Sequence, residues 1–356
     1  MRTWVHGADA SGFGLENLPY GIVRRPGEAP RPAVRIGDFA LELVHLLDGD
    51  AFAAPTLNPF LALGPHAWAD ARRRIRALLT DRSAAEPWLT PLSTLEVLLP
   101  IAPGDYVDFF ASLEHATNVG RRFRPDDPLP QAWRHVPIGY HGRAGSVVVS
   151  GTPVDRPSGL RGPGDFGPER RLDFELELGI VTGDRDPFGV VLLNDWSARE
   201  IQRFEYVPLG PFLGKSFATS ISPWVVPLEA LPLADPPAQD PPPVDYLRLE
   251  SPWALDVEVE AEVNGEVIAR SNTKELYWTV DQMLAHATVN GAELRAGDLF
   301  GTGTISSPGN PGCLLERDGP FLEDGDEVVL RGRAGDVSLG EVTGVVTSAE
   351  SVPSRA

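Results

Sequence analysis

The segment RLDFELELGIV, residues 171–181, alternates apolar and acidic side chains, and its acidic positions are Asp173, Glu175 and Glu177. Alternation with period two is typical of a half-buried β-strand. Side chains two residues apart on a strand lie on the same face, with their Cα atoms roughly 7 Å apart. The pattern therefore predicts a strand that gathers three carboxylates on one face with no cation between them. Any fold that contains this strand must offset the repulsion within that row.

A second acidic row shows that the pattern has an ordinary interpretation as well. The segment DVEVEAEV places Asp256, Glu258, Glu260 and Glu262 on alternate positions and leads directly into a hairpin turn at Asn264-Gly265. For this row we favour a solvated strand face.

The first row is followed by NDWSAREIQRFEY, residues 194–206, which differs from a solvated face. Read as a helix, this segment places Asp195, Arg199, Gln202 and Tyr206 along one stripe. A stripe at this spacing usually faces a core, whereas a solvated stripe more often repeats Glu and Lys. A structural and a functional interpretation of the stripe are about equally favoured by the pattern.

A histidine near the row offers a candidate general base. In DFFASLEHATNVGRRFR, Asp108 and His115 are seven residues apart, so on a helix they share a face about 10 Å apart along the axis. A lone histidine is more often structural than catalytic. Beside a row of acids it is a better candidate, because its unperturbed pKa lies near physiological pH.

Charge and cysteine content exclude several classes of protein. The formal net charge is −19, from 31 basic and 50 acidic residues, which argues against partners such as nucleic acid or anionic membrane surfaces. One cysteine rules out an internal disulfide and fits a reducing compartment. The beginning of the sequence has no apolar run of signal-peptide length, and no stretch approaches the ~18 apolar residues of a membrane span. The sequence predicts a soluble, cytoplasmic protein.

The chain is predicted to form two units, residues 1–99 and 103–350, with a mainly β, α+β composition. High Gly (36) and Pro (35) content favours a strand-rich, loop-rich fold. We expect hairpins at residues 32–44 and 256–271, helices at 66–79 and 273–291, and strands over 324–346. Residues 95–110 are expected to pass from an extended segment into a helix, and 233–245 to form a proline-rich loop.

Several local motifs are incomplete. GPFLGKS, from Gly210, has three residues between its glycines where a P-loop has four, and GTGTIS, from Gly301, lacks the third glycine of a dinucleotide fingerprint. No G-x-S-x-G indicates a serine hydrolase. Neither H-E-x-x-H nor C-x-x-C is present, so the sequence disfavours a zinc site.

An ordered set of motifs resembles the fumarylacetoacetase family, the fumarylacetoacetate hydrolases of tyrosine breakdown, in its long two-domain form. The motifs cover most of the chain and are ENLPYG, DFFASLEHATNVG, PIGYHGRAGSVVVSGT, LDFELELG, NDWSAREIQRFEYVPLGPFLGKSFATSISPW, RSNTKELYWT, GTGTISSP and LLERDG. The resemblance implies a small N-terminal SH3-like β-barrel, a C-terminal mixed β-roll catalytic domain and a homodimer. It also implies hydrolysis of the carbon–carbon bond of fumarylacetoacetate, a dicarboxylate diketo acid, to fumarate and acetoacetate.

The resemblance assigns roles to individual residues. It implies a divalent cation, Ca²⁺ or Mg²⁺, held by Asp108, Glu175, Glu177 and Asp195, with Lys215 and Thr219 near it. An all-carboxylate shell suits such hard cations. The catalytic positions are His115 as general base and Glu316 as its orienting partner. The positions that stabilise developing negative charge are Arg199, Gln202 and Lys215. The substrate-binding positions are Phe110, Arg124, Tyr140, Gln202, Tyr206 and Thr304.

Two positions depart from the family pattern. Phe110 stands where the family commonly has a substrate-contacting Tyr, and Ala218 stands where a Gly is usual. The first departure leaves open a hydrolase of another acylpyruvate or β-diketo acid. A third hypothesis, a non-catalytic β protein stabilised by a metal, gives no role to His115 and Glu316.

Overall fold

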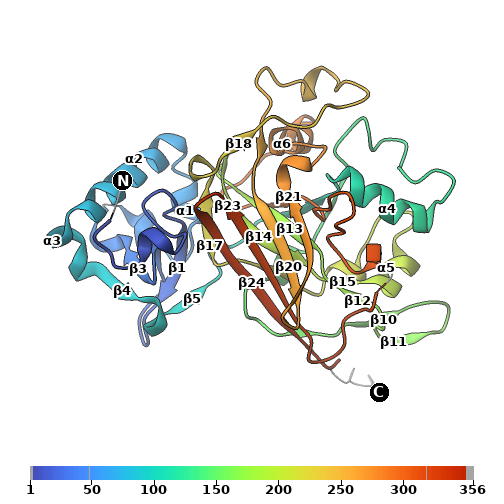
Figure 1. Ribbon diagram of the computed structural model, residues 1–356, viewed down its shortest axis with the longest axis horizontal. Helices are drawn as coiled ribbons and strands as arrows, with labels where there is room; N and C mark the ends of the chain where they lie inside the picture. The colour runs from blue at the N-terminus through green and yellow to red at the C-terminus, as the bar shows by residue number, and fades with distance from the viewer. Residues whose placement is uncertain (1–2, 48, 318, 350–356) are drawn as a thin grey trace.

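The computed structural model describes residues 3–47, 49–317 and 319–349. The outer ends of the two predicted units, residues 1, 2 and 350, lie outside these ranges, as does Asp318 of the LLERDG motif. The small unit, at the left of Figure 1, adjoins a larger unit built mainly of strands, which extends to the right. The mainly β, α+β class is confirmed.

The small unit is a sheet with one long helix beside it. Its strands are β1 (Tyr20–Arg24), β2 (Arg31–Ile36), β3 (Phe39–Glu42), β4 (Leu89–Pro91) and β5 (Glu96–Leu98), and its helices are α1 (Asn58–Leu61), α2 (Pro65–Thr80) and α3 (Arg82–Ala85). The expected hairpin at 32–44 is confirmed by β2–β3, and the helix at 66–79 by α2. The strand order is β4-β3-β2-β1, with β5 also paired to β1. No described pairing joins β4 to β5, so the closed SH3-like barrel is not confirmed.

The larger unit contains most of the strands. Its strands are β6 (Tyr106–Phe109), β7 (Gly139–His141), β8 (Val147–Val149), β9 (Val154–Asp155), β10 (Ser158–Leu160), β11 (Phe166–Pro168), β12 (Leu172–Asp173), β13 (Leu176–Thr182), β14 (Pro187–Asp195), β15 (Ser197–Ala198), β16 (Thr219–Ile221), β17 (Trp224–Pro227), β18 (Leu233–Ala234), β19 (Ala254–Leu255), β20 (Glu258–Val263), β21 (Glu266–Asn272), β22 (Leu299–Gly301), β23 (Glu327–Ala334) and β24 (Val337–Thr347). Its α-helices are α4 (Leu113–Phe123), α5 (Arg199–Glu205) and α6 (Val280–Thr288).

One sheet passes through both units. From β1 it continues through β17, β14, β13, β22, β6 and β7, and β1 joins β17 at Tyr20↔Val225. A shared apolar core lies across this junction, with Tyr20 and Phe60 from the small unit and Phe188 and Val225 from the larger one. The two units are therefore held together by both main-chain pairing and side-chain packing. The boundary near residue 100 remains a prediction.

A second sheet, β21-β20-β23-β24-β9, runs through the middle of Figure 1. Its β20–β21 hairpin turns at Asn264 (φ 52°) and Gly265 (φ 82°), the left-handed pair that a two-residue hairpin loop requires. The predicted hairpin at 256–271 and strands over 324–346 are thus confirmed. The larger unit's core contains the fully buried indoles of Trp133, Trp196 and Trp278.

Three helix predictions near the candidate residues are wrong. Residues 194–206 do not form one helix, because β14 extends to Asp195 and α5 begins only at Arg199. Asp108 and His115 do not share a helix, because Asp108 lies in β6 and Ser112 caps α4 by accepting a hydrogen bond from the backbone N–H of His115. Within residues 95–110 the extended start is confirmed by β5, but the helix expected at the end of this segment is replaced by the strand β6. Strand pairing in the sheet outweighs the helical spacing of the polar residues.

Two further predictions need correction. The helix expected over 273–291 begins only at Val280, because the Thr279–Gln282 capping box fixes its start. The acidic row at 171–181 is not a half-buried strand. It is interrupted at residues 174–175, between β12 and β13, and residues 172–181 are buried throughout. The alternation therefore marks acids inside the protein.

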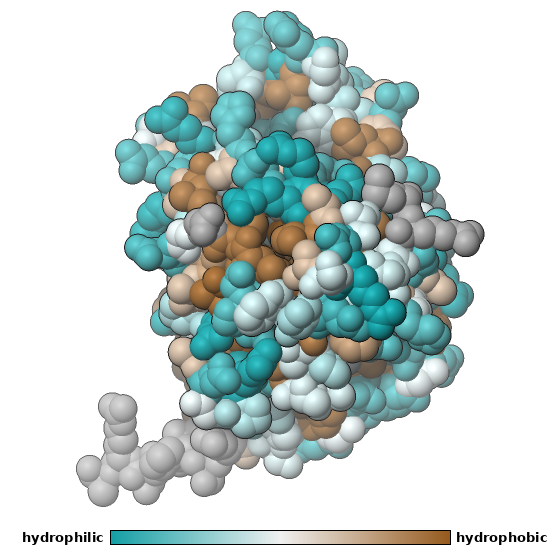
Figure 2. Space-filling model, turned by 90° about the vertical axis from the view of Figure 1, so that its left-hand side faces the viewer, coloured by the Kyte–Doolittle hydropathy of each residue, from teal (hydrophilic) through white to brown (hydrophobic). Residues whose placement is uncertain are grey.

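Figure 2 shows the side of the molecule formed by the small unit, a largely hydrophilic surface with an apolar area near its centre. Among the described helices, none combines the length and apolar character needed to cross a membrane.

Candidate active site

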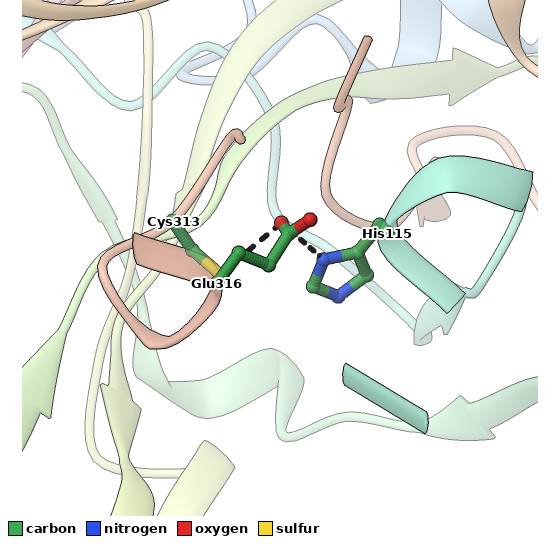
Figure 3. Close-up of side chains that lie close together, drawn as sticks. All are labelled: His115, Cys313 and Glu316. Carbon is green, nitrogen blue, oxygen red and sulfur yellow. Dashed lines mark hydrogen bonds and ion pairs between the residues drawn. The ribbon is translucent and has the colours of Figure 1, made fainter. Parts of the chain in front are cut away.

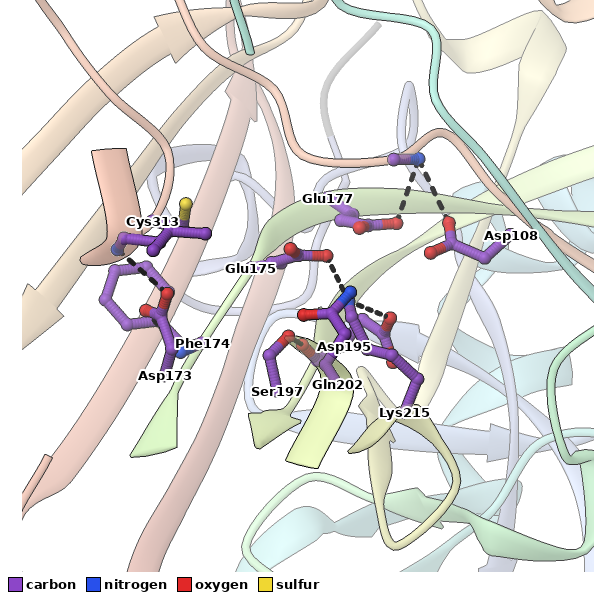
Figure 4. A network of polar contacts seen from close by, with 12 residues as sticks. Asp108, Asp173, Phe174, Glu175, Glu177, Asp195, Ser197, Gln202, Lys215 and Cys313 are labelled. Carbon is purple, nitrogen blue, oxygen red and sulfur yellow. Dashed lines mark hydrogen bonds and ion pairs between the residues drawn. The ribbon is translucent and has the colours of Figure 1, made fainter. Parts of the chain in front are cut away.

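Four buried carboxylates meet in the larger unit. Asp108, Glu175, Glu177 and Asp195 each offer an oxygen within 4.8 Å of the others, and each residue is at most 4% exposed. Asp108 comes from β6, Glu177 from β13 and Asp195 from the end of β14, while Glu175 lies just before β13 (Figure 4). Pairing of β14 with β13 and of β22 with both β13 and β6 brings these segments together. We call these four residues the carboxylate cluster.

Two buried cations neutralise part of the carboxylate cluster. Lys215 Nζ lies between Glu175 and Asp195, 2.6 Å from Asp195 Oδ2. Arg199 lies 2.8 Å from Glu175 Oε1 and 2.7 Å from Asp173 Oδ2. Asp173 also accepts hydrogen bonds from two backbone N–H groups of the 313–316 loop, so its carboxylate faces away from the cluster. With Asp173 included, five carboxylates lie near two cationic side chains.

The electrostatic surroundings divide the four carboxylates into two kinds. Burial and the neighbouring carboxylates hold the pKa values of Asp108 and Glu177 well above their ordinary range. Burial would also raise the pKa of Glu175, but Lys215 and Arg199 outweigh it and lower the pKa. Lys215 lowers the pKa values of Asp108 and Glu177 too, but burial and the neighbouring carboxylates outweigh it, and no described ion pair involves either residue.

The unsatisfied oxygens fit a divalent cation. Glu177 Oε1 is buried without a hydrogen-bond partner among the described residues, while Glu177 Oε2 and Asp108 Oδ1 share the backbone N–H of Gly303 at 3.1 and 3.2 Å. An all-oxygen, mostly anionic donor set is what Ca²⁺ and Mg²⁺ prefer. A cation at this position would satisfy Oε1 and offset the excess negative charge.

Two further polar side chains border the carboxylate cluster. The Tyr140 hydroxyl donates to Asp195 Oδ2 at 2.7 Å, and Thr219 Oγ1 donates to Asp195 Oδ1 at 3.2 Å. Thr219 is the cross-strand partner of Asp195 in the β14–β16 pair, which fixes this contact. The sequence-predicted metal-site residues thus lie together.

Gly301 is predicted to be essential for the geometry of the carboxylate cluster. A Cβ atom there would lie 2.7 Å from Asp108 Oδ1 and 2.9 Å from Glu177 Oε2. Gly301→Ala should displace both oxygens and weaken cation binding by about 10- to 100-fold, the scale of outer-shell changes at metal sites. Calorimetric titration with Ca²⁺ or Mg²⁺ measures this. Gly162→Ala, where no atom of the described residues lies within 4 Å of the added Cβ, is the control. Equal affinities in both variants would contradict the prediction.

His115 and Glu316 form a buried pair near the carboxylate cluster. His115 Nδ1 lies 2.7 Å from Glu316 Oε1, and the Glu316 side chain is fully buried (Figure 3). Burial would raise the pKa of Glu316, but His115 and the hydrogen bonds from Asn118 and Ser306 lower it to about 2. Glu316 is therefore an ionised acceptor, so in the neutral form of His115 the Nδ1 atom is the donor to Glu316 and Nε2 is the acceptor. His115 also lies close enough to Glu175 to lower its pKa.

The sequence analysis missed the residues that hold Glu316. Ser306 Oγ donates to Glu316 Oε1 at 2.7 Å, and Asn118 Nδ2 donates to Oε2 at 2.9 Å. Asn118 is three residues after His115 on α4, so helical spacing could have identified it. No local signal identifies Ser306, because its contact depends on the path of the loop after β22.

The remaining predicted site residues differ in how they contact the carboxylate cluster and the His115–Glu316 pair. The Phe110 ring packs edge-on against the His115 ring, with centroids 5.3 Å apart. Gln202 Oε1 accepts from Arg199 Nη1 at 3.2 Å, which places Gln202 beside the carboxylate cluster. Thr304 is buried, and no residue in the described part of the chain hydrogen-bonds its Oγ1. Tyr206 is the C-cap residue of α5.

Arg124 is engaged elsewhere in this structure. It ends α4, and its guanidinium donates to the Pro128 carbonyl oxygen at 2.8 Å. None of its described contacts is with the carboxylate cluster.

The fold and the site together indicate a class of protein, an enzyme with a candidate metal site of carboxylates beside a histidine–glutamate pair. Comparison with known proteins identifies the family. Residues 106–347 match the fumarylacetoacetate hydrolase C-terminal model, and residues 16–100 match the fumarylacetoacetase N-terminal model. The chain belongs to the fumarylacetoacetate hydrolase family.

Full-length relatives agree with this assignment. The fumarylacetoacetases of Oryza sativa and Homo sapiens are each 42% identical to the chain. The first alignment covers 98% of this chain and the second covers 96%, and each covers 98% of the relative. A solved fumarylacetoacetate hydrolase from Exiguobacterium antarcticum has a TM-score of 0.60 at 20% identity, covering 93% of this chain and 99% of that one. A maleylpyruvate hydrolase from Sphingobium, solved with manganese(II) and pyruvate, has a TM-score of 0.55 at 18% identity, covering 94% and 99%. These two structures are evidence for the fold alone.

Proposed function

We propose that the chain hydrolyses the carbon–carbon bond of fumarylacetoacetate to give fumarate and acetoacetate, the last step of tyrosine and phenylalanine breakdown. The observation that carries the proposal is the 42% identity to fumarylacetoacetases over nearly the full length of both chains. Incubation with fumarylacetoacetate and identification of the products tests it directly. Absence of turnover in folded protein with its cation bound would instead support the non-catalytic hypothesis.

The carboxylate cluster is proposed to hold the cofactor, Ca²⁺ or Mg²⁺. Asp108, Glu175, Glu177 and Asp195 would hold the cation, with Lys215 and Thr219 beside them. When bound, the cation supplies Lewis-acid polarisation of the diketone oxygens. The rest of the reaction depends on the protein's own side chains.

His115 is proposed to act as the general base. Its Nε2 accepts a proton from water, and the resulting hydroxide attacks a ketone carbonyl carbon of the substrate. The adjacent carbon–carbon bond then breaks, and the electron pair leaves as an enolate that takes up a proton to give acetoacetate. Glu316, held by Ser306 and Asn118, fixes the Nδ1–H tautomer and stabilises the imidazolium that forms.

We propose that Arg199 and Lys215 stabilise the negative charge that develops on the substrate during the reaction, and the burial of their positive charges supports this role. Both side chains are at most 4% exposed, so their charges act in a region where solvent screening is weak. Gln202 is proposed to assist Arg199, with which it shares a hydrogen bond.

The proposed substrate-binding residues are less uniformly placed. Phe110 lies against His115. Tyr140 and Gln202 lie beside the carboxylate cluster. Thr304 lies in the glycine-containing segment that follows β22. For Arg124 and Tyr206 the proposal rests on the family resemblance.

A second candidate function is hydrolysis of another acylpyruvate or β-diketo acid. Phe110 favours it, since a residue that packs on the proposed base lacks the hydroxyl that the family commonly presents. Steady-state rates on a panel of diketo acids separate the two functions. A kcat/KM for another diketo acid well above that for fumarylacetoacetate would replace the first proposal.

Phe110→Tyr tests whether the missing hydroxyl matters. The contact between the Phe110 and His115 rings supports a position for the added hydroxyl near the proposed base. A hydrogen bond from it to a charged substrate group is worth roughly 1.5–3 kcal/mol. We expect KM for fumarylacetoacetate to fall several-fold or more with little change in kcat, because the contact is made equally in the ground and transition states. An unchanged or raised KM would reject the lost hydrogen bond.

Assembly and location are proposed from the resemblance and the composition. We propose a homodimer, a closed SH3-like small unit and a cytoplasmic location, the last supported by the single cysteine. Light scattering after size-exclusion chromatography measures the oligomeric state, and a monomeric mass would reject the dimer.

A further inference from the structure

The single cysteine of the chain lies beside the His115–Glu316 pair. Cys313 is fully buried in the loop that ends in Glu316, and its Sγ is 3.4 Å from Glu316 Oε1 (Figure 3). One nitrogen of His115, the sulfur of Cys313 and one oxygen of Glu316 all lie within 4.8 Å of one another. The proposed hydrolysis gives Cys313 no role, although its sulfur adjoins the proposed base.

The three ligand atoms differ in kind from the carboxylate cluster. Zn²⁺ binds imidazole nitrogen, thiolate sulfur and carboxylate oxygen in tetrahedral sites, with metal–ligand distances of roughly 2.0–2.3 Å. Tetrahedral bonds of that length separate a sulfur from an oxygen by roughly 3.6 Å, and the pair is already 3.4 Å apart. The His115 nitrogen, 2.7 Å from Glu316 Oε1, would move outward by roughly 0.6–0.8 Å. No motif spacing reveals this set, because His115 is 201 residues from Glu316.

We propose that His115, Cys313 and Glu316 form a second metal site, selective for Zn²⁺, whose occupation inhibits the enzyme. It is separate from the carboxylate cluster, which shares none of its ligands. The three protein ligands leave a fourth tetrahedral position for water.

The chemistry of binding explains the inhibition, and this part rests on the proposed role of His115. The Cys313 thiol releases its proton to solvent as the zinc–sulfur bond forms. Zinc takes the Nδ1 lone pair, so the imidazole proton moves from Nδ1 to Nε2. Nε2 is then a donor and can no longer accept a proton from water. Zinc would thus inhibit without displacing the cation of the carboxylate cluster.

Cobalt spectroscopy tests the site independently of turnover. The protein is first saturated with Mg²⁺ and then titrated with Co²⁺, a coloured substitute for Zn²⁺. Because the chain has one cysteine, a thiolate-to-cobalt charge-transfer band can come only from Cys313. We expect this band to grow to one equivalent, to vanish when Zn²⁺ is added, and to be absent in Cys313→Ser and Cys313→Ala. Absence of the band in folded wild-type protein would overturn the proposed site.

Inhibition is measured on the same Mg²⁺-saturated samples. Loss of one ligand should weaken zinc inhibition by at least about 10- to 100-fold in both cysteine variants. Equal zinc inhibition in wild type and variants would overturn the inhibitory role and place the effect at the carboxylate cluster. If the enzyme does not hydrolyse fumarylacetoacetate at all, the cobalt band still decides whether the site exists, so failure of this inference and failure of the proposed function are distinguishable. Circular dichroism confirms folding of each variant.

Discussion

Removing divalent cations should abolish hydrolysis and lower the thermal stability of the protein. The carboxylate cluster is buried, and with Asp173 it sets five carboxylates against two cations. Without a bound cation this excess must be relieved by protonation or by local rearrangement. A cation that binds only the folded state stabilises it by about 2.7 kcal/mol at 100 times its dissociation constant. Activity and the melting temperature, measured after chelation and after restoring Ca²⁺ or Mg²⁺, check both effects. Full activity in metal-free protein would contradict the proposed cofactor.

Asp195→Asn isolates one carboxylate of this cluster. Asp195 pairs with Lys215 and accepts hydrogen bonds from Tyr140 and Thr219, so the amide loses an ion pair as well as a metal ligand. We expect cation affinity to fall by at least about 10- to 100-fold. Glu258→Gln, at the exposed first position of β20, is the matched control and should leave affinity unchanged. Similar losses in both variants would mean that net charge, and not the carboxylate cluster, governs cation binding.

Replacing His115 by alanine should lower kcat by about 10²-fold or more, the scale of general-base loss. The fold and the cation content should persist, because the imidazole hydrogen-bonds Glu316 and contacts Phe110 but does not belong to the carboxylate cluster. Steady-state kinetics with metal analysis of the same samples measures both quantities. His66→Ala, on the exposed side of α2, controls for loss of a histidine elsewhere. Near-normal turnover in His115→Ala would require a different base.

Glu316→Gln should lower kcat less than the loss of His115 does. Both carboxylate oxygens of Glu316 accept hydrogen bonds: Oε1 accepts from His115 and Ser306, and Oε2 accepts from Asn118. In either orientation a glutamine would present its NH₂ group to a donor. We expect a lower kcat with little change in KM, because orientation and imidazolium stabilisation act in the transition state. A raised KM with unchanged kcat would assign Glu316 to substrate binding.

The sequence predicted some local elements well. Helix α2 has a regular apolar spacing, and the hairpin at Asn264-Gly265 has the residues that positive φ angles favour, so neighbouring residues alone specify both. Prediction failed for residues 194–206, where a helical stripe of polar side chains proved to be a strand end followed by a short helix. There, pairing of β14 with β13 and β16 decides the backbone, and no partner strand is visible in a local pattern.

The sequence by itself determined which residues are proposed to carry the chemistry, through its motifs and their resemblance to a family. These residues are the acids of the 171–181 row, Asp108, Asp195, and the histidine and glutamate of two distant motifs. Only the tertiary structure decided that the row is buried, that Asp173 pairs with Arg199 outside the carboxylate cluster, and that Cys313 lies beside Glu316. The physical reason is that alternation records which side chains share a face of a strand, whereas burial depends on what covers that face. Proximity between His115 and Glu316 likewise depends on packing of α4 against the loop that carries Glu316, which no spacing along the chain encodes.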